Sequence, residues 1–412
     1  MSAARTRAAT PEAAVPATAV LNDRGAERVR AGHPWVYAGE ILGWEPAEPA
    51  PDARAPVRLR DRRARELGLA DFSPHSQIRL RLLSRDPAAR VDAAFFRQRL
   101  EQALAYRQRL VRGSDAYRLV AAEADGLPGL IVDRYAAALV VQTLTWPMAA
   151  RQSELVAALE ELLQPAVVVE RNEVKVRQKE GLELRRGLLR GEAAAASQTE
   201  VAINGLRFQL DLLEGQKTGG FLDQRENWAA AAGYAAALGA QSALDVFTYQ
   251  GGFALHLARH CPRVEAVDSS RPALEAAERN GERNRLGAID WVEANAFDLL
   301  RDYDQNDRRF DVVVLDPPAF AKSRAALATA AAGYKEINLR ALKLLNPGGL
   351  LVTCSCSHHL SEAHLLDILA AAARDARREL TLLERRGQAC DHPVLLNVPE
   401  TAYLKCIFAV AR

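Results

Sequence analysis

Two cysteines stand one residue apart in the stretch "GGLLVTCSCSHHL", residues 348–360, of a chain that holds five cysteines among 412 residues. A thiol at the end of an apolar run can act as a nucleophile once it loses its proton. Five scattered cysteines do not form a disulfide framework, and this spacing lacks the second cysteine pair that a zinc site needs. Cys354 and Cys356 therefore either pack as small apolar side chains or take part in covalent catalysis.

The stretch "ALDVFTYQGGFALHLA", residues 243–258, is typical of a strand, a glycine turn and the start of a helix. Gly251 and Gly252 allow a ligand to approach the backbone closely at the amino end of that helix. The stretch has neither the G-x-G-x-x-G pattern of dinucleotide sites nor the Walker lysine pattern, which disfavours NAD and ATP.

Four aspartates follow successive predicted strands: Asp245, Asp268, Asp298 and Asp316. In an open α/β sheet ligands bind beyond the carboxyl ends of the strands, where a carboxylate can hold ribose hydroxyls. Four carboxylates suit a cofactor that carries hydroxyl groups, an adenine amine and a positive charge, and S-adenosylmethionine fits this description. No metal site is expected.

The elements that would position these residues alternate from about residue 200 onward. Short apolar strands, such as "ALDVF", "FDVVVLDPP" and "GLLVTCS", are each followed or preceded by a helical segment. Strands that are apolar on both faces indicate a parallel sheet covered by helices on both sides. We therefore predict an α/β, Rossmann-like domain over residues 199–412.

Two smaller domains are predicted before it. Residues 17–92 contain short β-type runs, and in "SQIRLRLLS" Arg79 and Arg81 alternate with apolar residues, which predicts a small β-barrel that presents arginines on one face. The stretch "GHPWVYAGEI" resembles the opening of a PUA domain, an RNA-binding module, and this implies that Arg79 and Arg81 contact RNA. Residues 93–198 combine helical segments with a hairpin that turns through Asp125 and Gly126, so we expect an α+β domain. Residues 1–16 are expected to be a flexible leader.

Charge is unevenly distributed along the chain. Residues 1–120 hold 21 Arg and Lys against 14 Asp and Glu, a net charge of +7, whereas residues 121–412 have a net charge of −5. An excess of basic residues at one end favours an anionic partner, with nucleic acid the first candidate. No apolar run approaches the ~18 residues of a membrane span, and the few cysteines favour a cytoplasmic protein.

Several motifs together resemble one family. The stretches "GHPWVYAG" (32–39), "EGQKTGGFLDQREN" (214–227), "DPPAFAKS" (316–323), "TCSCS" and "QACDHP" (388–393) resemble the 23S ribosomal RNA cytosine-5 methyltransferases that carry an amino-terminal PUA domain. This resemblance implies a class I methyltransferase domain with a seven-stranded sheet, S-adenosylmethionine as cofactor and 23S ribosomal RNA as partner. It places cofactor contacts at five residues, in addition to Gly251: Gln224, Arg225, Asp245, Asp268 and Asp298.

Carbon 5 of a pyrimidine is a poor nucleophile, and addition of a cysteine thiolate at carbon 6 activates it. The family motif Thr-Cys-Ser matches around either cysteine, but the longer strand favours Cys356 as the nucleophile because it lies nearer the mouth of the cleft. Asp316 is expected to bind the N3/N4 edge of a flipped cytosine, and Phe320 to stack on it. The motif "DPPAF" lacks the second cysteine of many cytosine-5 enzymes, so the sequence leaves the choice of base in doubt.

Other readings stay open at this stage. The target atom could be uracil carbon 5 or guanine N7 or N2, or the chain could be a non-catalytic, RNA-binding assembly factor. Three histidines, His358, His359 and His392, are possible proton carriers, and the sequence does not identify the proton-abstracting base. It also leaves open the modified nucleotide, whether the substrate is naked RNA or a particle, and the oligomeric state, for which a homodimer is one candidate.

Overall fold

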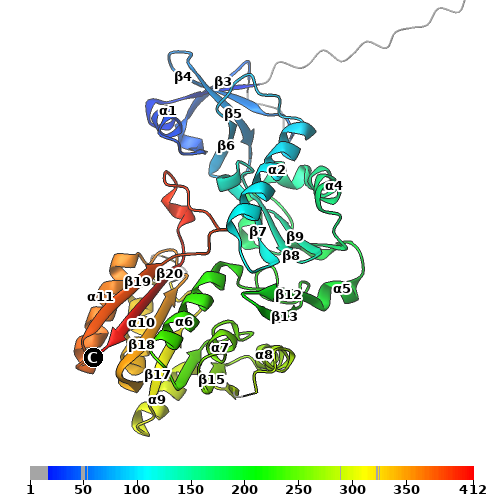
Figure 1. The fold of residues 1–412 in the computed structure, drawn as a ribbon. Helices are drawn as coiled ribbons and strands as arrows, with labels where there is room; N and C mark the ends of the chain where they lie inside the picture. Colours follow the sequence, from blue (N-terminus) through cyan, green and yellow to red (C-terminus); the bar gives the residue numbers. More distant parts are fainter. Residues whose placement is uncertain (1–16, 48–51, 53, 288, 322, 324) are drawn as a thin grey trace, which may run out of the picture.

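The computed structural model describes residues 17–47, 52, 54–287, 289–321, 323 and 325–412, and Figure 1 shows three modules along the chain. The expected leader, residues 1–16, lies outside the described residues. Within the described part of the chain, no helix is long and apolar enough to span a membrane.

The amino-terminal module is a six-stranded sheet with the strand order β2-β6-β5-β4-β1-β3. Its pairs are antiparallel except for β1 with β4. Alternate residues of β4 are buried, as the period of a strand requires, and they pack against α1, whose Asn22 cap accepts a hydrogen bond from Gly25 N. The elements are β1 (Thr18–Leu21), α1 (Asp23–Arg30), β2 (Trp35–Tyr37), β3 (Ile41–Glu45), β4 (Val57–Asp61), β5 (Glu66–Phe72) and β6 (Ile78–Ser84).

The middle module is a five-stranded mixed sheet with the order β11-β10-β9-β8-β7. The hairpin predicted at Asp125 and Gly126 is present, because β7 and β8 pair antiparallel across a short 3-10 turn that ends in Gly126 at φ +67°. Helices α2 and α4 cover one face of the sheet. The elements are α2 (Ala93–Leu110), β7 (Ala116–Ala121), β8 (Leu130–Tyr135), β9 (Ala138–Thr143), α3 (Trp146–Ala150), α4 (Gln152–Leu163), β10 (Val167–Asn172), β11 (Arg185–Arg190) and α5 (Ala193–Ser197).

The carboxyl-terminal module contains a seven-stranded sheet with the order β16-β15-β14-β17-β18-β20-β19. Only β20 runs antiparallel to its neighbours, which confirms the predicted mostly parallel sheet. The strands are β14 (Ser242–Val246), β15 (Arg263–Asp268), β16 (Ile289–Glu293), β17 (Phe310–Leu315), β18 (Leu345–Ser355), β19 (Leu380–Arg386) and β20 (Lys405–Ala411).

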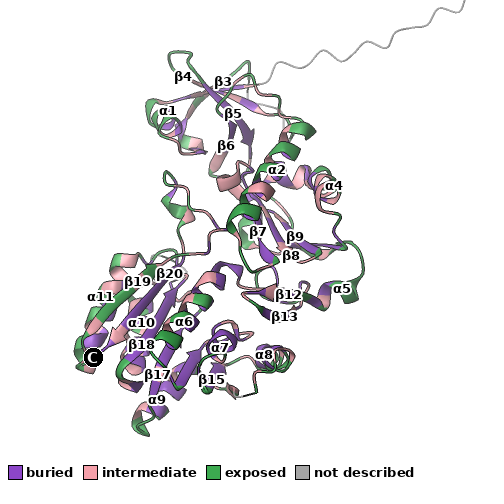
Figure 2. Ribbon diagram, viewed as in Figure 1, coloured by how far each residue is buried: buried purple, intermediate pink, exposed green. Residues whose placement is uncertain are grey.

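Helices cover both faces of this sheet, as the apolar strands predicted. Helices α6 and α7 contribute to the core on one face, and α9, α10 and α11 to the core on the other. The central strands β14, β17, β18 and β20 are therefore mostly buried, whereas the edge strands β16 and β19 are more exposed (Figure 2). The helices are α6 (Arg225–Ala237), α7 (Gly252–Leu257), α8 (Arg271–Arg283), α9 (Ala296–Gln305), α10 (Leu327–Leu344) and α11 (Glu362–Ala376).

A hairpin of β12 (Thr199–Ile203) and β13 (Leu206–Leu210) links the last two modules. Its apolar side chains belong to one continuous core that contains Tyr135 and Val169 of the middle sheet and Leu350 of the last sheet. The middle and last modules therefore pack together as a unit. Helix α2 begins at residue 93 and strand β12 at residue 199. The domain boundaries expected at 92/93 and 198/199 fall at these points and stay proposals.

Candidate active site

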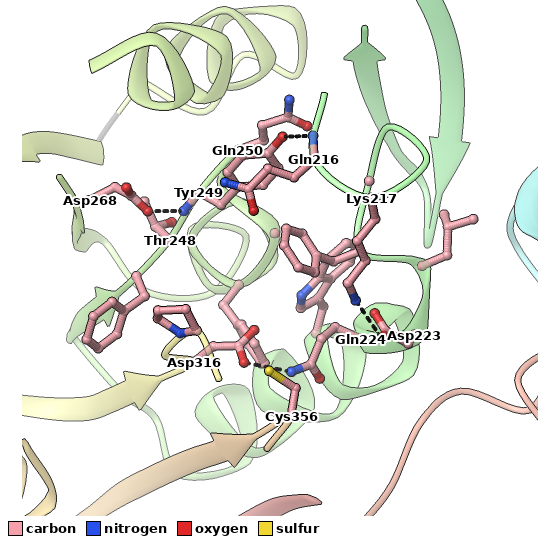
Figure 3. Close-up of a pocket in the computed structure, with 18 of the residues that line it drawn as sticks. Gln216, Lys217, Asp223, Gln224, Thr248, Tyr249, Gln250, Asp268, Asp316 and Cys356 are labelled. Atoms are coloured by element: carbon pink, nitrogen blue, oxygen red, sulfur yellow. Dashed lines mark hydrogen bonds and ion pairs between the residues drawn. The ribbon is translucent and has the colours of Figure 1, made fainter. Parts of the chain in front are cut away.

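The carboxyl ends of β14, β15, β17 and β18 surround a cavity of about 320 Å³. This is the crevice at which the strand order reverses, since β14 has β15 on one side and β17 on the other. The turn after β14 forms part of the wall, and residues 216–224, which precede α6, close the cavity from the side of the middle module. Figure 3 shows the polar side chains that point into it.

Asp268 ends β15 and lines one end of the cavity. Its carboxylate accepts hydrogen bonds from Tyr249 N and Ser270 N, both at 2.9 Å, so its orientation is fixed by the two neighbouring loops. Gly252, the first residue of α7, also lines the cavity, whereas Gly251, at φ +83°, forms the turn behind it.

Asp245 lies near the end of β14, beneath this turn, and is fully buried. One carboxylate oxygen accepts from Thr248 Oγ1 at 2.6 Å and Ala254 N at 2.9 Å, while Oδ1 has no partner among the described residues. Burial raises the pKa of Asp245 to about 7. Asp245 therefore shapes the turn and does not itself line the cavity.

Two residues predicted to bind the cofactor lie elsewhere. Arg225 is buried and forms a two-pronged ion pair with Asp391, at 2.9 and 3.0 Å. Asp298 lies in the first turn of α9, with its side chain 76% exposed and paired with Arg301. Neither residue lines the cavity.

The two cysteines of the opening motif have different surroundings. Cys354, on β18, is fully buried, and its Sγ lies 3.2 Å from Sγ of Cys406 on the antiparallel partner strand. Cys356 follows the last residue of β18, is partly exposed and lines the cavity. All five cysteines are free thiols. Of the two, only Cys356 can meet a ligand in the cavity.

Asp316 follows β17 and lines the cavity together with Cys356. Its Oδ1 accepts a hydrogen bond from Gln224 Nε2 at 3.0 Å, and Gln224 Oε1 accepts one from Asn227 at 2.6 Å, which fixes the orientation of the Gln224 amide. Burial, with the nearby Asp223 carboxylate as a second cause, raises the pKa of Asp316 to about 7. Asp316 is thus able to hold a proton near neutral pH.

Several polar residues at or beside the cavity were not singled out from the sequence, among them Asp223, Lys217 and Tyr403. Asp223 accepts hydrogen bonds from Lys217 Nζ at 2.7 Å and from the Tyr403 hydroxyl at 2.8 Å. Asp223 and Lys217 line the main cavity and also a second one of about 190 Å³, whose wall includes Arg118, His392 and Tyr403. Lys217 and Asp223 lie within the motif "KTGGFLDQREN" and could have been noticed there. Tyr403 could not, because it is 180 residues away from Asp223 in the sequence.

The side chains predicted to contact RNA form contacts within the protein. Arg81 is buried in an ion pair with Glu180 of the middle module at 2.8 Å, while Arg79 is half-buried and donates to Pro74 O. Phe320 packs 4.8 Å from the ring centroid of Tyr334 and does not line the cavity. The geometry brings neither Arg81 nor Phe320 to an open surface of the site.

Of the three histidines, His358 and His359 are exposed, whereas His392 is 5% exposed. The described residues contain no group of three or more His, Cys, Asp or Glu side chains that could hold a metal ion.

The cavity fits S-adenosylmethionine. It offers a fixed carboxylate at Asp268 for ribose hydroxyls, the backbone of the glycine turn, and apolar walls such as Phe247 and Phe253. A Cβ at Gly252 would lie 2.4 Å from the ring of Trp228, so an alanine there would disturb this wall. Asp268, Thr248, Tyr249 and Gly252 would hold the cofactor.

The sheet order and the cavity at its switch point define a Rossmann-like methyltransferase fold. The model of the S-adenosylmethionine-dependent methyltransferase family matches residues 127–409, and that of the PUA-like domain matches residues 19–85. The chain is also 39% identical over 378 residues, 90% of this chain and 94% of the relative, to ribosomal RNA large subunit methyltransferase I of Escherichia coli and of Cronobacter sakazakii. It belongs to this family of S-adenosylmethionine-dependent methyltransferases.

Solved structures confirm the fold over nearly the whole chain. A protein described as a methyltransferase and complexed with SAH has a TM-score of 0.80 at 19% identity, covering 95% of this chain and 99% of that one. A protein from Streptococcus mutans, described as SAM-dependent, gives 0.78 at 19% identity with the same coverage.

Proposed function

We propose that this protein methylates carbon 5 of a cytosine in 23S ribosomal RNA, with Cys356 as the covalent nucleophile. The name of its relatives, ribosomal RNA large subunit methyltransferase I, supports large-subunit ribosomal RNA as the substrate. The observation that carries the chemistry is the position of Cys356, a partly exposed thiol that lines the cofactor cavity together with Asp316.

Cys356 would activate the base by adding to carbon 6, which makes carbon 5 a nucleophile. S-adenosylmethionine, when bound, supplies an electrophilic methyl group. Because Cys354 is fully buried against Cys406, a base in the cavity can reach only Cys356 of this pair.

Asp316 would control the proton that this addition requires. Burial and the negative charge of Asp316 raise the pKa of the Cys356 thiol. If the thiol proton moves to Asp316, the charge that opposes the thiolate disappears. The protonated Asp316 can then donate to N3 of the cytosine while the thiolate adds to carbon 6. Gln224 holds Asp316 in place through its 3.0 Å hydrogen bond.

The amino-terminal module would hold the RNA. Its family match to PUA-like domains and the net charge of +7 over residues 1–120 support this role. Because Arg81 is committed to Glu180, we propose that other arginines of this module supply most of the phosphate contacts.

The nucleophile can be tested with RNA that contains 5-fluorocytosine, whose carbon 5 carries no removable proton and therefore traps the cysteine adduct. We expect Cys356→Ala to lose both the trapped adduct and methylation while it keeps cofactor binding. Cys354→Ala is the matched control and should keep measurable activity. The adduct is read by denaturing gel electrophoresis, and methylation by nucleoside analysis.

Loss of the adduct in Cys354→Ala alone would exchange the two roles. Methylation of carbon 5 by both single variants would exclude covalent catalysis by this pair. Absence of an adduct in the wild-type protein would favour a different target atom or a non-catalytic role.

A further inference from the structure

Asp223 lines the reaction cavity and carries one buried carboxylate oxygen that has no partner among the described residues. The residue is 3% exposed, and its Oδ2 accepts from Lys217 and Tyr403. Its Oδ1 has no hydrogen-bond partner within the described residues. A buried oxygen without a donor is costly in free energy. Asp223 therefore has an oxygen that can accept a proton without first losing a hydrogen bond to the protein.

The pKa values of Asp223 and Asp316, which line the same cavity, are shifted in opposite directions. Burial alone would raise the pKa of Asp223, but the positive charges of Lys217 and His392 hold it well below its usual range. Burial raises the pKa of Asp316 to about 7. When the pKa values of two carboxyl groups in one site are shifted apart, the group with the raised pKa suits the role of an acid and the other that of a base.

The two ends of the cavity are chemically distinct. In Figure 3, Asp268 and Asp223 lie at opposite ends of the labelled set, with Asp316, Gln224 and Cys356 between them. Asp268 marks the cofactor end. A base that sits above Cys356 would therefore have Asp223 on the side away from the cofactor, where the hydrogen of carbon 5 is directed once a methyl group has been added.

Other side chains that could remove the carbon-5 proton either lie outside the cavity or are engaged in other contacts. His392 lines the second cavity but not the one that contains Cys356. Lys405 Nζ donates to Ser357 O at 2.8 Å and to Tyr403 O at 2.9 Å, so its charge is engaged with backbone carbonyls. His358 and His359 are exposed and line neither cavity.

We infer that Asp223 is the catalytic base that removes the proton from carbon 5. The inference rests on the proposed function. In the methylated adduct, the Asp223 carboxylate takes the carbon-5 proton, the electrons of that C–H bond form the C5=C6 double bond, and the C6–S bond breaks to return the thiolate of Cys356. The N3 proton returns to Asp316. Atoms and charges then balance, and no oxidant or further reactant is needed.

The second cavity gives the abstracted proton a way out. It adjoins Asp223 and is lined by polar groups of Arg118, Asp133, His392 and Tyr403. Its volume of about 190 Å³ has room for water that can hydrogen-bond to these groups. Asp223, which lines both cavities, is placed to pass the proton from one to the other.

The test uses Asp223→Asn, which keeps the side-chain shape and removes the base. With cytosine RNA and S-adenosylmethionine labelled in the methyl group, we expect one round of methyl transfer and a labelled protein–RNA adduct that persists on a denaturing gel. Steady-state turnover should fall about 100-fold or more. Tritium at carbon 5 of the RNA should be released by the wild type and retained by the variant. Asp307→Asn, at an exposed site outside both cavities, is the matched control and should behave as the wild type.

Calorimetry separates the alternatives. A large loss of cofactor affinity without adduct accumulation would assign Asp223 to the cofactor and overturn the inference, as would wild-type turnover in a folded variant. If Asp223→Asn fails to fold, Asp223→Glu retains the charge beside Lys217 and should show slowed adduct breakdown, and unchanged breakdown would contradict the inference. A 5-fluorocytosine adduct in the wild type shows that the proposed function holds even when this base assignment fails.

Discussion

Asp223, Asp268 and Asp316 share one cavity, but their carboxyl groups have different hydrogen-bond partners. Asp268 accepts from two backbone amides, Asp223 from a lysine and a tyrosine, and Asp316 from a single glutamine amide. The number and charge of the donors decide how far the ionised form is stabilised against burial. The cavity can therefore combine a group that binds hydroxyls, a base and an acid of the same residue type.

The cofactor end of the cavity is testable at one residue. Asp268→Ala should weaken S-adenosylmethionine binding by the loss of a charged hydrogen bond, about 1.5–3 kcal/mol or roughly 10- to 150-fold in Kd. Asp298→Ala should leave Kd unchanged, because this side chain is exposed on α9 and outside the cavity. Titration calorimetry on both folded variants measures the effect, and an unchanged Kd for Asp268→Ala would exclude this assignment.

Residues that line the cavity could be predicted where the strand pattern alone places them. Counting along the strand singled out Cys356 over Cys354, and Asp268 ends its strand as expected. The roles of Arg225 and Arg81 could not be foreseen, since their partners Asp391 and Glu180 lie 166 and 99 residues away. Asp223 was missed because its unpartnered oxygen becomes visible only after Tyr403 and Lys217 have been placed.

At the scale of elements, apolar strands and glycine turns predicted the parallel sheet and the position of the cavity. The antiparallel direction of β20 could not be predicted from the sequence. A strand that is buried on both faces has the same apolar pattern whichever way it runs. Asp298 was expected to follow the third strand, but β16 ends at Glu293 and the chain has already entered α9. One turn of helix is enough to direct that carboxylate to solvent.

Helices α6 and α7 can pack closely because Gly252 has no side chain. A Cβ at Gly252 would lie 2.4 Å from Cε2 of Trp228, which packs in the core beneath the glycine turn. Gly252→Ala should lower the free energy of unfolding by about 1–3 kcal/mol through overpacking and should weaken cofactor binding. Urea denaturation measures the first effect and calorimetry the second.

Two further variants separate overpacking from a general intolerance of alanine. In the double variant Gly252→Ala/Trp228→Leu, the penalty of the alanine should be smaller than in the wild-type background, which a double-mutant cycle resolves. Gly233→Ala lies on the exposed side of α6 with no atom within 4 Å of the added Cβ, and it should be neutral or stabilising. Equal losses at Gly233 and Gly252 would contradict the role of Trp228.

At the scale of the molecule, buried ion pairs connect the modules. Arg81 with Glu180 and Arg151 with Asp71 join the amino-terminal and middle modules, and Asp391 of the last module accepts from Arg225 and from the backbone of Arg118 in the middle module. Breaking such a pair leaves an uncompensated buried charge. Removing residues 1–90 would therefore leave Glu180 and Arg151 without their partners, so the proposed RNA-binding role of the first module is better tested by surface substitutions than by deletion.

The turn between β4 and β5 offers such a test, because Arg62, Arg63 and Arg65 are exposed there in the basic part of the chain. If they contact phosphates, the triple alanine variant should bind ribosomal RNA more weakly. The slope of log K against log salt should become less steep by about 0.7–0.9 per contact, or roughly 2–3 in total. Cofactor affinity should stay unchanged. The same number of alanines at Arg301, Arg309 and Arg374, exposed on the last module, controls for net charge. Equal slopes for the two triple variants would show that the basic excess of the first module is a solvated surface and that the RNA is held elsewhere.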